Sequence, residues 1–149
     1  MTGIFGTGAP LEVDINLILQ IVSFLVIVVG LVYKTKKKFK MHGKMMGVAV
    51  ILHVISFLAV MGPVFFGNFG IYLDYILYTE IQTTWIHTIP GAAAMILGIL
   101  LVGLWTLKPA NMAACSKRKR LMDLTVLLWL ISLVFGIGTY ILVYTSVTT

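Results

Sequence analysis

Residues 15–44 read INLILQIVSFLVIVVGLVYKTKKKFKMHGK, an uncharged apolar run followed by six lysines. The run from Ile15 to Tyr33 is long enough to cross the roughly 30 Å hydrocarbon core of a bilayer, which takes about 20 helical residues. The lysines between Lys34 and Lys44 are too costly to follow the run into lipid. This stretch therefore predicts a transmembrane helix that ends in a basic loop.

Three more apolar runs of similar length follow. In the whole chain 60% of residues are hydrophobic and 11% are charged, against about 45–50% and 25% in soluble domains. A soluble fold of this size cannot hide so much apolar surface, so a water-soluble enzyme is excluded. We expect an all-α protein, a four-helix transmembrane bundle that forms a single integral membrane domain over residues 1–149. The expected spans are Ile15–Tyr33, Met45–Gly67, Thr84–Leu107 and Leu121–Tyr144.

The basic residues orient these helices. All eleven Lys and Arg residues lie in two clusters, within residues 34–44 and 108–120. Such clusters are typical of cytoplasmic loops, so we expect both termini and the connection over residues 68–83 on the outer face. Cys115 lies in the second cluster without a disulfide partner, which agrees with a reducing cytoplasmic side. The pattern indicates a multi-pass membrane protein with its basic loops in the cytoplasm and no nucleic-acid partner. We expect it in the plasma membrane of a prokaryote.

The two halves of the chain resemble each other weakly. A gapless alignment of residues 44–58 with residues 120–134 matches five pairs, one of which is Ser56 with Ser132. A repeat of this kind predicts two parallel helical hairpins, in which the second and fourth helices occupy equivalent places in the bundle. In the same register His53 corresponds to Trp129.

Polar side chains gather in the outer half of the predicted spans. Asn16, Gln20 and Ser23 are spaced i, i+4 and i+7 and share one helix face, which in lipid has to turn toward protein. Four side chains that are unsuited to lipid fall at comparable depth, namely Asn16, Gln20, His87 and Tyr140. We expect these four to converge on one interior site. The alternative is that they only form hydrogen bonds between helices.

The chain has three histidines, His42, His53 and His87. An ionisable side chain at membrane depth indicates a functional site, and neutral imidazole is a common axial ligand of haem. All three are therefore candidate ligands of a haem b. Alternatively, His42 snorkels to the membrane interface, while the other two form hydrogen bonds across helices.

Depth distinguishes the three candidates. Counted from the inner helix ends at about 1.5 Å per residue, His53 lies roughly 12 Å and His87 roughly 30 Å deep. This difference strains a bis-histidine site formed by the pair. His87, one turn before the irregularity of Pro90 and Gly91, is the expected ligand if haem or a metal binds. His42 is not its partner, because it lies near the opposite membrane face.

Short motifs in three spans resemble a known family. The second span opens with H-x-x-x-M-x-x-A at residues 42–49, residues 85–89 read WIHTI, and residues 125–144 carry T-x-x-x-W and G-x-x-x-Y-x-x-x-Y. With these motifs the chain resembles the YozB/CtaM-like membrane proteins, domain-of-unknown-function family 420, over nearly its whole length. The resemblance implies a role in assembling or maturing haem–copper terminal oxidases. It places His42 and His87 at suspected haem- or metal-binding positions.

These observations predict an integral membrane accessory protein or small subunit of a respiratory haem–copper oxidase system. Its expected partners are membrane lipids and other membrane protein subunits, such as those of a terminal oxidase. One alternative is a b-type cytochrome that transfers electrons between a quinol and a partner, and another is a non-catalytic packing subunit of a larger complex. No catalytic residue is assigned, because the chain has no Gly-rich phosphate loop, no CxxC or HExxH motif and no paired carboxylates in a span.

Overall fold

The computed structural model describes residues 3–107 and 117–145. Cys115, the predicted cytoplasmic thiol, lies outside the described residues. Within them the chain is all-helical and has no strand. Four helical segments are long and apolar enough to cross a membrane, as predicted, and they run over Leu11–Thr35, Phe39–Gly67, Thr79–Leu107 and Lys119–Tyr144.

The helices extend beyond the predicted spans at their N-terminal ends. Helix α1 (Leu11–Thr35) begins four residues before Ile15, and its first turn contains Glu12 and Asp14. Acidic side chains in a first turn interact favourably with the helix dipole. Helix α2 (Phe39–Ser56) begins six residues before Met45. Hydropathy bounds only the part of a helix that lies in hydrocarbon, whereas backbone hydrogen bonds continue into the polar interface.

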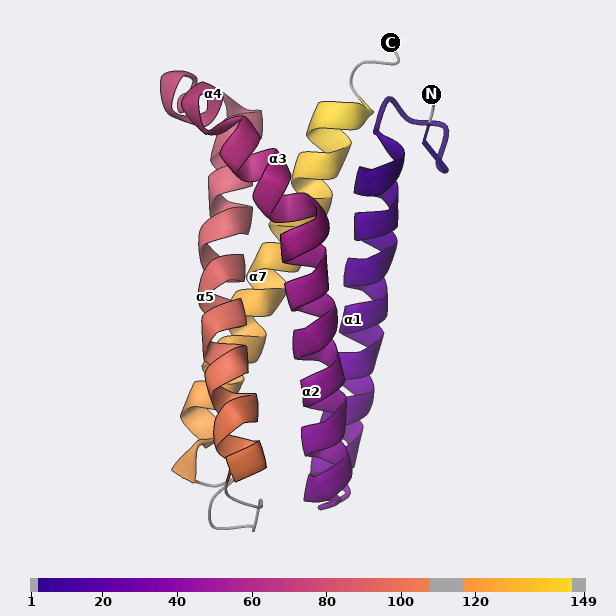
Figure 1. Cartoon of the computed structure of the whole chain (residues 1–149), viewed down its shortest axis with the longest axis vertical. Helices are drawn as coiled ribbons and strands as arrows, with labels where there is room; N and C mark the ends of the chain where they lie inside the picture. Colours follow the sequence, from indigo (N-terminus) through magenta and orange to yellow (C-terminus); the bar gives the residue numbers. More distant parts are fainter. Residues whose placement is uncertain (1–2, 108–116, 146–149) are drawn as a thin grey trace.

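Two hairpins, each made of two antiparallel helices, lie side by side in the bundle and run in the same direction (Figure 1). Helix α1 packs along α2, α5 (Thr79–Leu107) packs along α7 (Lys119–Tyr144), and α2 contacts α5. The start of α1 and the end of α7 lie at the end of the bundle that also carries α4 (Phe69–Asp74), and the turn from α1 to α2 lies at the other end. This is the predicted arrangement of hairpins, whereas the membrane side of each end stays a prediction.

We call the end of the bundle that carries α4 the outer end and the opposite end the inner end, after their predicted sides of the membrane. The second span changes its winding near the outer end, which was not predicted from the sequence. A π-helical turn, η1 (Phe57–Met61), follows α2 and leads into α3 (Gly62–Gly67). The backbone N–H of Gly62 donates to the carbonyl of Phe57, and Pro63 has no N–H to restore the regular α-helical pattern. Beyond this point α3 leans toward the outer end of α5 (Figure 1).

The centre of the bundle is a small apolar core. Ile27, Ala49, Ala94 and Trp129 are its buried members, and the ring of Phe24 stacks on that of Trp129 with centroids 6.1 Å apart. The core draws on α1, α2, α5 and α7, and so it joins the two hairpins. All four buried members line the smaller of two cavities, and the larger cavity lies nearer the end that carries α4.

Candidate functional site

The larger cavity occupies the outer half of the bundle and has a volume of about 300 Å³. We name it the outer cavity. All four side chains of the predicted polar cluster line it, namely Asn16, Gln20, His87 and Tyr140. His53, Ser56 and Met61 also line it, and of these the sequence analysis had considered only His53 as a ligand. The structure thus brings the predicted cluster to one cavity and adds members from α2 and η1.

Ser56 links the two amides of the cluster. Its hydroxyl accepts a hydrogen bond from Gln20 Nε2 at 2.6 Å and donates one to Asn16 Oδ1 at 2.5 Å. Asn16 Nδ2 in turn donates to the sulfur of Met61 at 3.1 Å. Ser56 is almost fully buried, with 1% of its surface exposed. Met61 is the last residue of η1, and the change of winding there left no simple periodic signal for this contact.

Tyr140 has a different role from the amides. Its hydroxyl donates to Asp14 Oδ1 at 2.6 Å and lies 2.8 Å from the hydroxyl of Thr7. Asp14 is fully buried and accepts a second hydrogen bond from the backbone N–H of Phe5 at 3.2 Å. The segment before α1 therefore folds over the outer end of the bundle and is held there through Asp14, a residue that the sequence analysis did not assign to a site.

The position of His87 fixes its tautomer. Its Nδ1 lies 2.7 Å from the backbone carbonyl of Ser132, and because a carbonyl only accepts, Nδ1 carries the proton. The neutral ring then keeps a lone pair on Nε2. Nε2 has no hydrogen-bond partner among the described residues. Every fully buried side-chain nitrogen or oxygen in these residues does have a partner, so Nε2 is not fully buried and is open to the cavity that His87 lines.

Tight packing against α7 holds the His87 ring in this orientation. The hydroxyl of Ser132 donates to the backbone carbonyl of His87 at 2.8 Å. A Cβ atom at Gly136 would lie 2.7 Å from His87 Nδ1, so only glycine leaves room for the ring. A Cβ atom at Gly91 would lie 2.7 Å from the Ser132 hydroxyl. The small residues of α5 and α7 thus allow the close approach that aligns His87.

His53 has no free lone pair. Trp129 Nε1, which can only donate, lies 3.1 Å from His53 Nδ1. The proton of the neutral ring is therefore on Nε2, so neither nitrogen offers a lone pair to a metal. His53 thus links the two hairpins through a hydrogen bond. This agrees with the alternative prediction that His53 forms hydrogen bonds across helices rather than binding haem.

The two histidines lie closer in depth than residue counts predict. His53 contacts Trp129 and His87 contacts Ser132, and these partners are three residues apart on α7, a rise of about 4.5 Å. The predicted difference of roughly 18 Å is therefore wrong. One reason is that α2 begins at Phe39 rather than Met45, which moves His53 away from the inner end.

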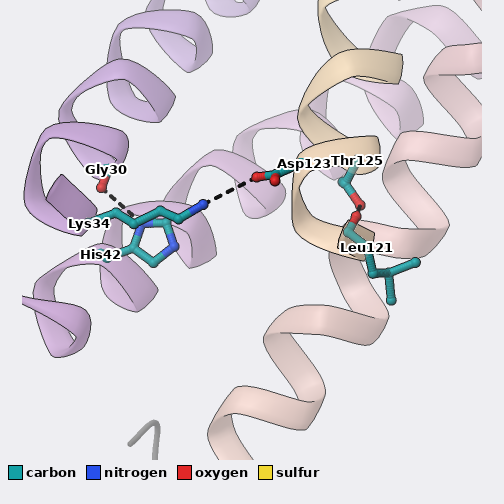
Figure 2. Close-up of polar contacts among 6 residues, drawn as sticks. All are labelled: Gly30, Lys34, His42, Leu121, Asp123 and Thr125. Carbon is teal, nitrogen blue, oxygen red and sulfur yellow. Dashed lines mark hydrogen bonds and ion pairs between the residues drawn. The ribbon is translucent and has the colours of Figure 1, made fainter. Parts of the chain in front are cut away.

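His42 lies at the other end of the bundle, beside a second cavity of about 130 Å³. Its Nδ1 donates to the carbonyl of Gly30 at 2.8 Å (Figure 2). Close by, Lys34 of α1 reaches Asp123 of α7, with 3.2 Å between Nζ and Oδ1. Only 5% of the His42 surface is exposed, so the alternative that His42 snorkels to the interface is wrong. His42 and His87 do not share a cavity.

The donor set of the outer cavity does not fit a haem b with two histidine ligands. His87 Nε2 is one available axial nitrogen, whereas the lone pair of His53 Nδ1 accepts from Trp129 and its Nε2 carries the proton. The described Lys and Arg residues lie between 34 and 44 or between 117 and 120, at the opposite end, so none can pair with the carboxylates of haem. Glu80 lines the cavity instead. Among the described residues no group of three or more His, Cys, Asp or Glu could hold a metal ion.

Comparisons with known proteins add no relative. No protein-family model matches the chain, and neither a curated protein nor a solved structure matches it.

Proposed function

We propose that the chain is an integral membrane accessory protein or small subunit of a respiratory haem–copper oxidase system. The resemblance of residues 42–49, 85–89 and 125–144 to an oxidase-assembly family supports the choice of system. The observation that carries the accessory role is the low burial of the spans. In their most apolar windows only 11–28% is buried inside the chain, so most of the apolar surface faces lipid or partner subunits.

The histidines support an accessory protein over a b-type cytochrome. Electron transfer through a bis-histidine haem needs two free imidazole nitrogens at one site, and the outer cavity has one, on His87. The residues of this chain would contribute a hydrogen-bonding cavity and a large lipid-facing surface. Its partners are membrane lipids and the subunits of the oxidase, and the basic loops lie against the anionic cytoplasmic leaflet.

A tagged copy and a deletion strain test the accessory role. We expect haem–copper oxidase subunits to co-purify with the tagged chain. We expect the deletion to lower the haem absorbance of the haem–copper oxidase in the membranes several-fold, while the absorbance of other cytochromes stays unchanged. A purified chain with its own reversible haem spectrum would instead support the cytochrome. If the chain co-purifies with a membrane complex but the deletion leaves the amount of oxidase in the membranes unchanged, the packing subunit would be supported.

The orientation is tested by cysteine labelling. In a Cys115→Ser background, Gly70→Cys and Lys36→Cys place single thiols at opposite ends of the bundle, both at exposed positions. Since the basic loops are expected inside, a membrane-impermeant maleimide should label Gly70→Cys in intact cells and Lys36→Cys only after permeabilisation. The reverse pattern would place both termini in the cytoplasm and contradict the proposed orientation.

A further inference from the structure

We propose that the outer cavity binds the head group of a membrane quinol, with His87 Nε2 accepting a hydrogen bond from one of its hydroxyls. This ligand is a neutral aromatic diol with an apolar tail. The proposal does not depend on the oxidase system, because it rests on the cavity alone.

His87 Nε2 is the hydrogen-bond acceptor that the cavity presents. The Ser132 carbonyl fixes the proton of His87 on Nδ1, and the ring lies close against Gly136 of α7. Nε2 is therefore a pre-oriented acceptor at the wall of a cavity in the membrane. An acceptor without a partner in an apolar medium is costly, and a hydroxyl donor on the ligand satisfies it.

Charge favours a neutral ligand. The described Lys and Arg residues all lie at the opposite end of the bundle, and the acidic residue that lines the outer cavity is Glu80. An anionic ligand such as haem, with two carboxylates, would meet a carboxylate and no cation. A cationic ligand could pair with Glu80, but it would lose its hydration among walls that are mostly apolar. A neutral hydroxyl donor suits both Glu80 and His87 Nε2 without that cost.

The walls of the cavity suit a flat apolar ring. Phe57, Phe65 and Tyr72 line the cavity with aromatic rings, and Leu17 and Val60 contribute aliphatic surface. Such walls bury a flat ring, and the lipid around the spans accommodates an apolar tail. The quinol class combines a flat ring with a tail and two hydroxyls.

Two phenols of the cavity wall are candidate donors to the second oxygen of the ring. Tyr72 of α4 and Tyr144 of α7 both line the cavity. Burial, with a contribution from the nearby Tyr144, raises the pKa of Tyr72 above its usual range. Tyr72 therefore stays a protonated donor at neutral pH. It can donate to a ligand oxygen while His87 accepts from the other.

The test is calorimetric titration of the purified full chain in detergent under anaerobic conditions. The probes are a ubiquinol analogue with a ten-carbon tail, the corresponding quinone, and haemin. We expect the quinol to bind about fivefold to tenfold more tightly than the quinone, because the quinone has no hydroxyl to donate to His87. This comparison needs no substitution, so it stays valid if a variant fails to fold.

Variants locate the site. His87→Ala and Gly136→Val, which displaces the His87 ring, should each raise the Kd for the quinol about tenfold. His42→Ala is the matched control, because His42 has the same Nδ1-to-carbonyl hydrogen bond in the other cavity. The Kd of this variant for the quinol should differ from that of the unchanged chain by less than twofold. Folding of each variant is checked by thermal denaturation.

Three results would overturn the proposal: no quinol binding, equal Kd values for quinol and quinone, or a quinol affinity that is insensitive to His87→Ala. Addition of haemin could also produce a Soret band. If His87→Ala abolishes this band and the quinol does not compete with haemin, the cavity would be assigned to haem instead. Loss of oxidase co-purification with quinol binding intact would refute the oxidase role and leave this proposal standing.

Discussion

Replacement of Tyr140 by phenylalanine is expected to lower the free energy of unfolding by about 2–3 kcal/mol. The Tyr140 hydroxyl donates to Asp14, whose carboxylate is fully buried and has one further donor among the described residues, the backbone N–H of Phe5. A hydrogen bond to a buried charge is stronger than one between neutral groups, and breaking it leaves the charge poorly compensated. Equilibrium unfolding of the purified protein in mixed micelles of mild detergent and SDS measures the change.

Tyr144→Phe is the matched control for Tyr140→Phe. Tyr144 packs against Tyr140, with ring centroids 5.6 Å apart, and its hydroxyl forms no hydrogen bond within the described residues. The same atom is removed from a neighbouring ring, so we expect a loss of less than about 0.5 kcal/mol. Equal losses for the two variants would show that the Asp14 contact contributes nothing specific.

The Tyr140 contact has a second consequence at the N-terminal end. Thr7 and Phe5 are held over the bundle through Tyr140 and Asp14. When Tyr140→Phe removes the shared hydroxyl, we expect this segment to open and to be cleaved more rapidly by added protease, while the four spans stay protected by the micelle.

Ser56→Ala is the second substitution with a large expected effect, a loss of about 1–2 kcal/mol. The Ser56 hydroxyl is the hydrogen-bond partner of both Gln20 Nε2 and Asn16 Oδ1. Removing it leaves a donor and an acceptor without partners in the outer half of the bundle. The same unfolding assay measures this loss.

Ser132, the residue that corresponds to Ser56 in the internal repeat, provides the comparison. Its hydroxyl donates to the carbonyl of His87, and a helical carbonyl keeps its own backbone partner when that donor is lost. Ser132→Ala also leaves the Ser132 carbonyl that orients His87 in place. We therefore expect a loss of about 0.5 kcal/mol. A larger loss for Ser132→Ala than for Ser56→Ala would contradict the central place of Ser56 in the network.

The repeat itself links sequence and structure. Ser56 bonds to Asn16 within the first hairpin, and Ser132 bonds to His87 within the second. Each serine thus connects the second helix of its hairpin to a polar residue on the first. His53 and Trp129, which also correspond in the repeat, contact each other across the bundle. The gapless alignment predicted equivalent helices but not that these equivalent residues would meet.

The sequence by itself determined the four helices, their grouping into hairpins and the level at which Asn16, Gln20, His87 and Tyr140 lie. These properties are local, since the thickness of the bilayer sets the length of an apolar run and the helical rise sets depth within it. The extra residues at the start of α2, and the winding change at η1, were missed because hydropathy does not register backbone hydrogen bonding at the interface or beside Pro63.

Only the tertiary structure decided which polar groups are engaged and which are free. The sequence separated His53 from His87 by counted depth and by the irregularity at residues 90–91, not by their partners. In the structure His53 is bonded to Trp129, 76 residues away, and His87 keeps Nε2 open to the outer cavity. The sliding and rotation of each helix against its neighbours select these partners. Packing sets that geometry through contacts such as Gly136 against the His87 ring, and the contacts join segments that no local pattern connects.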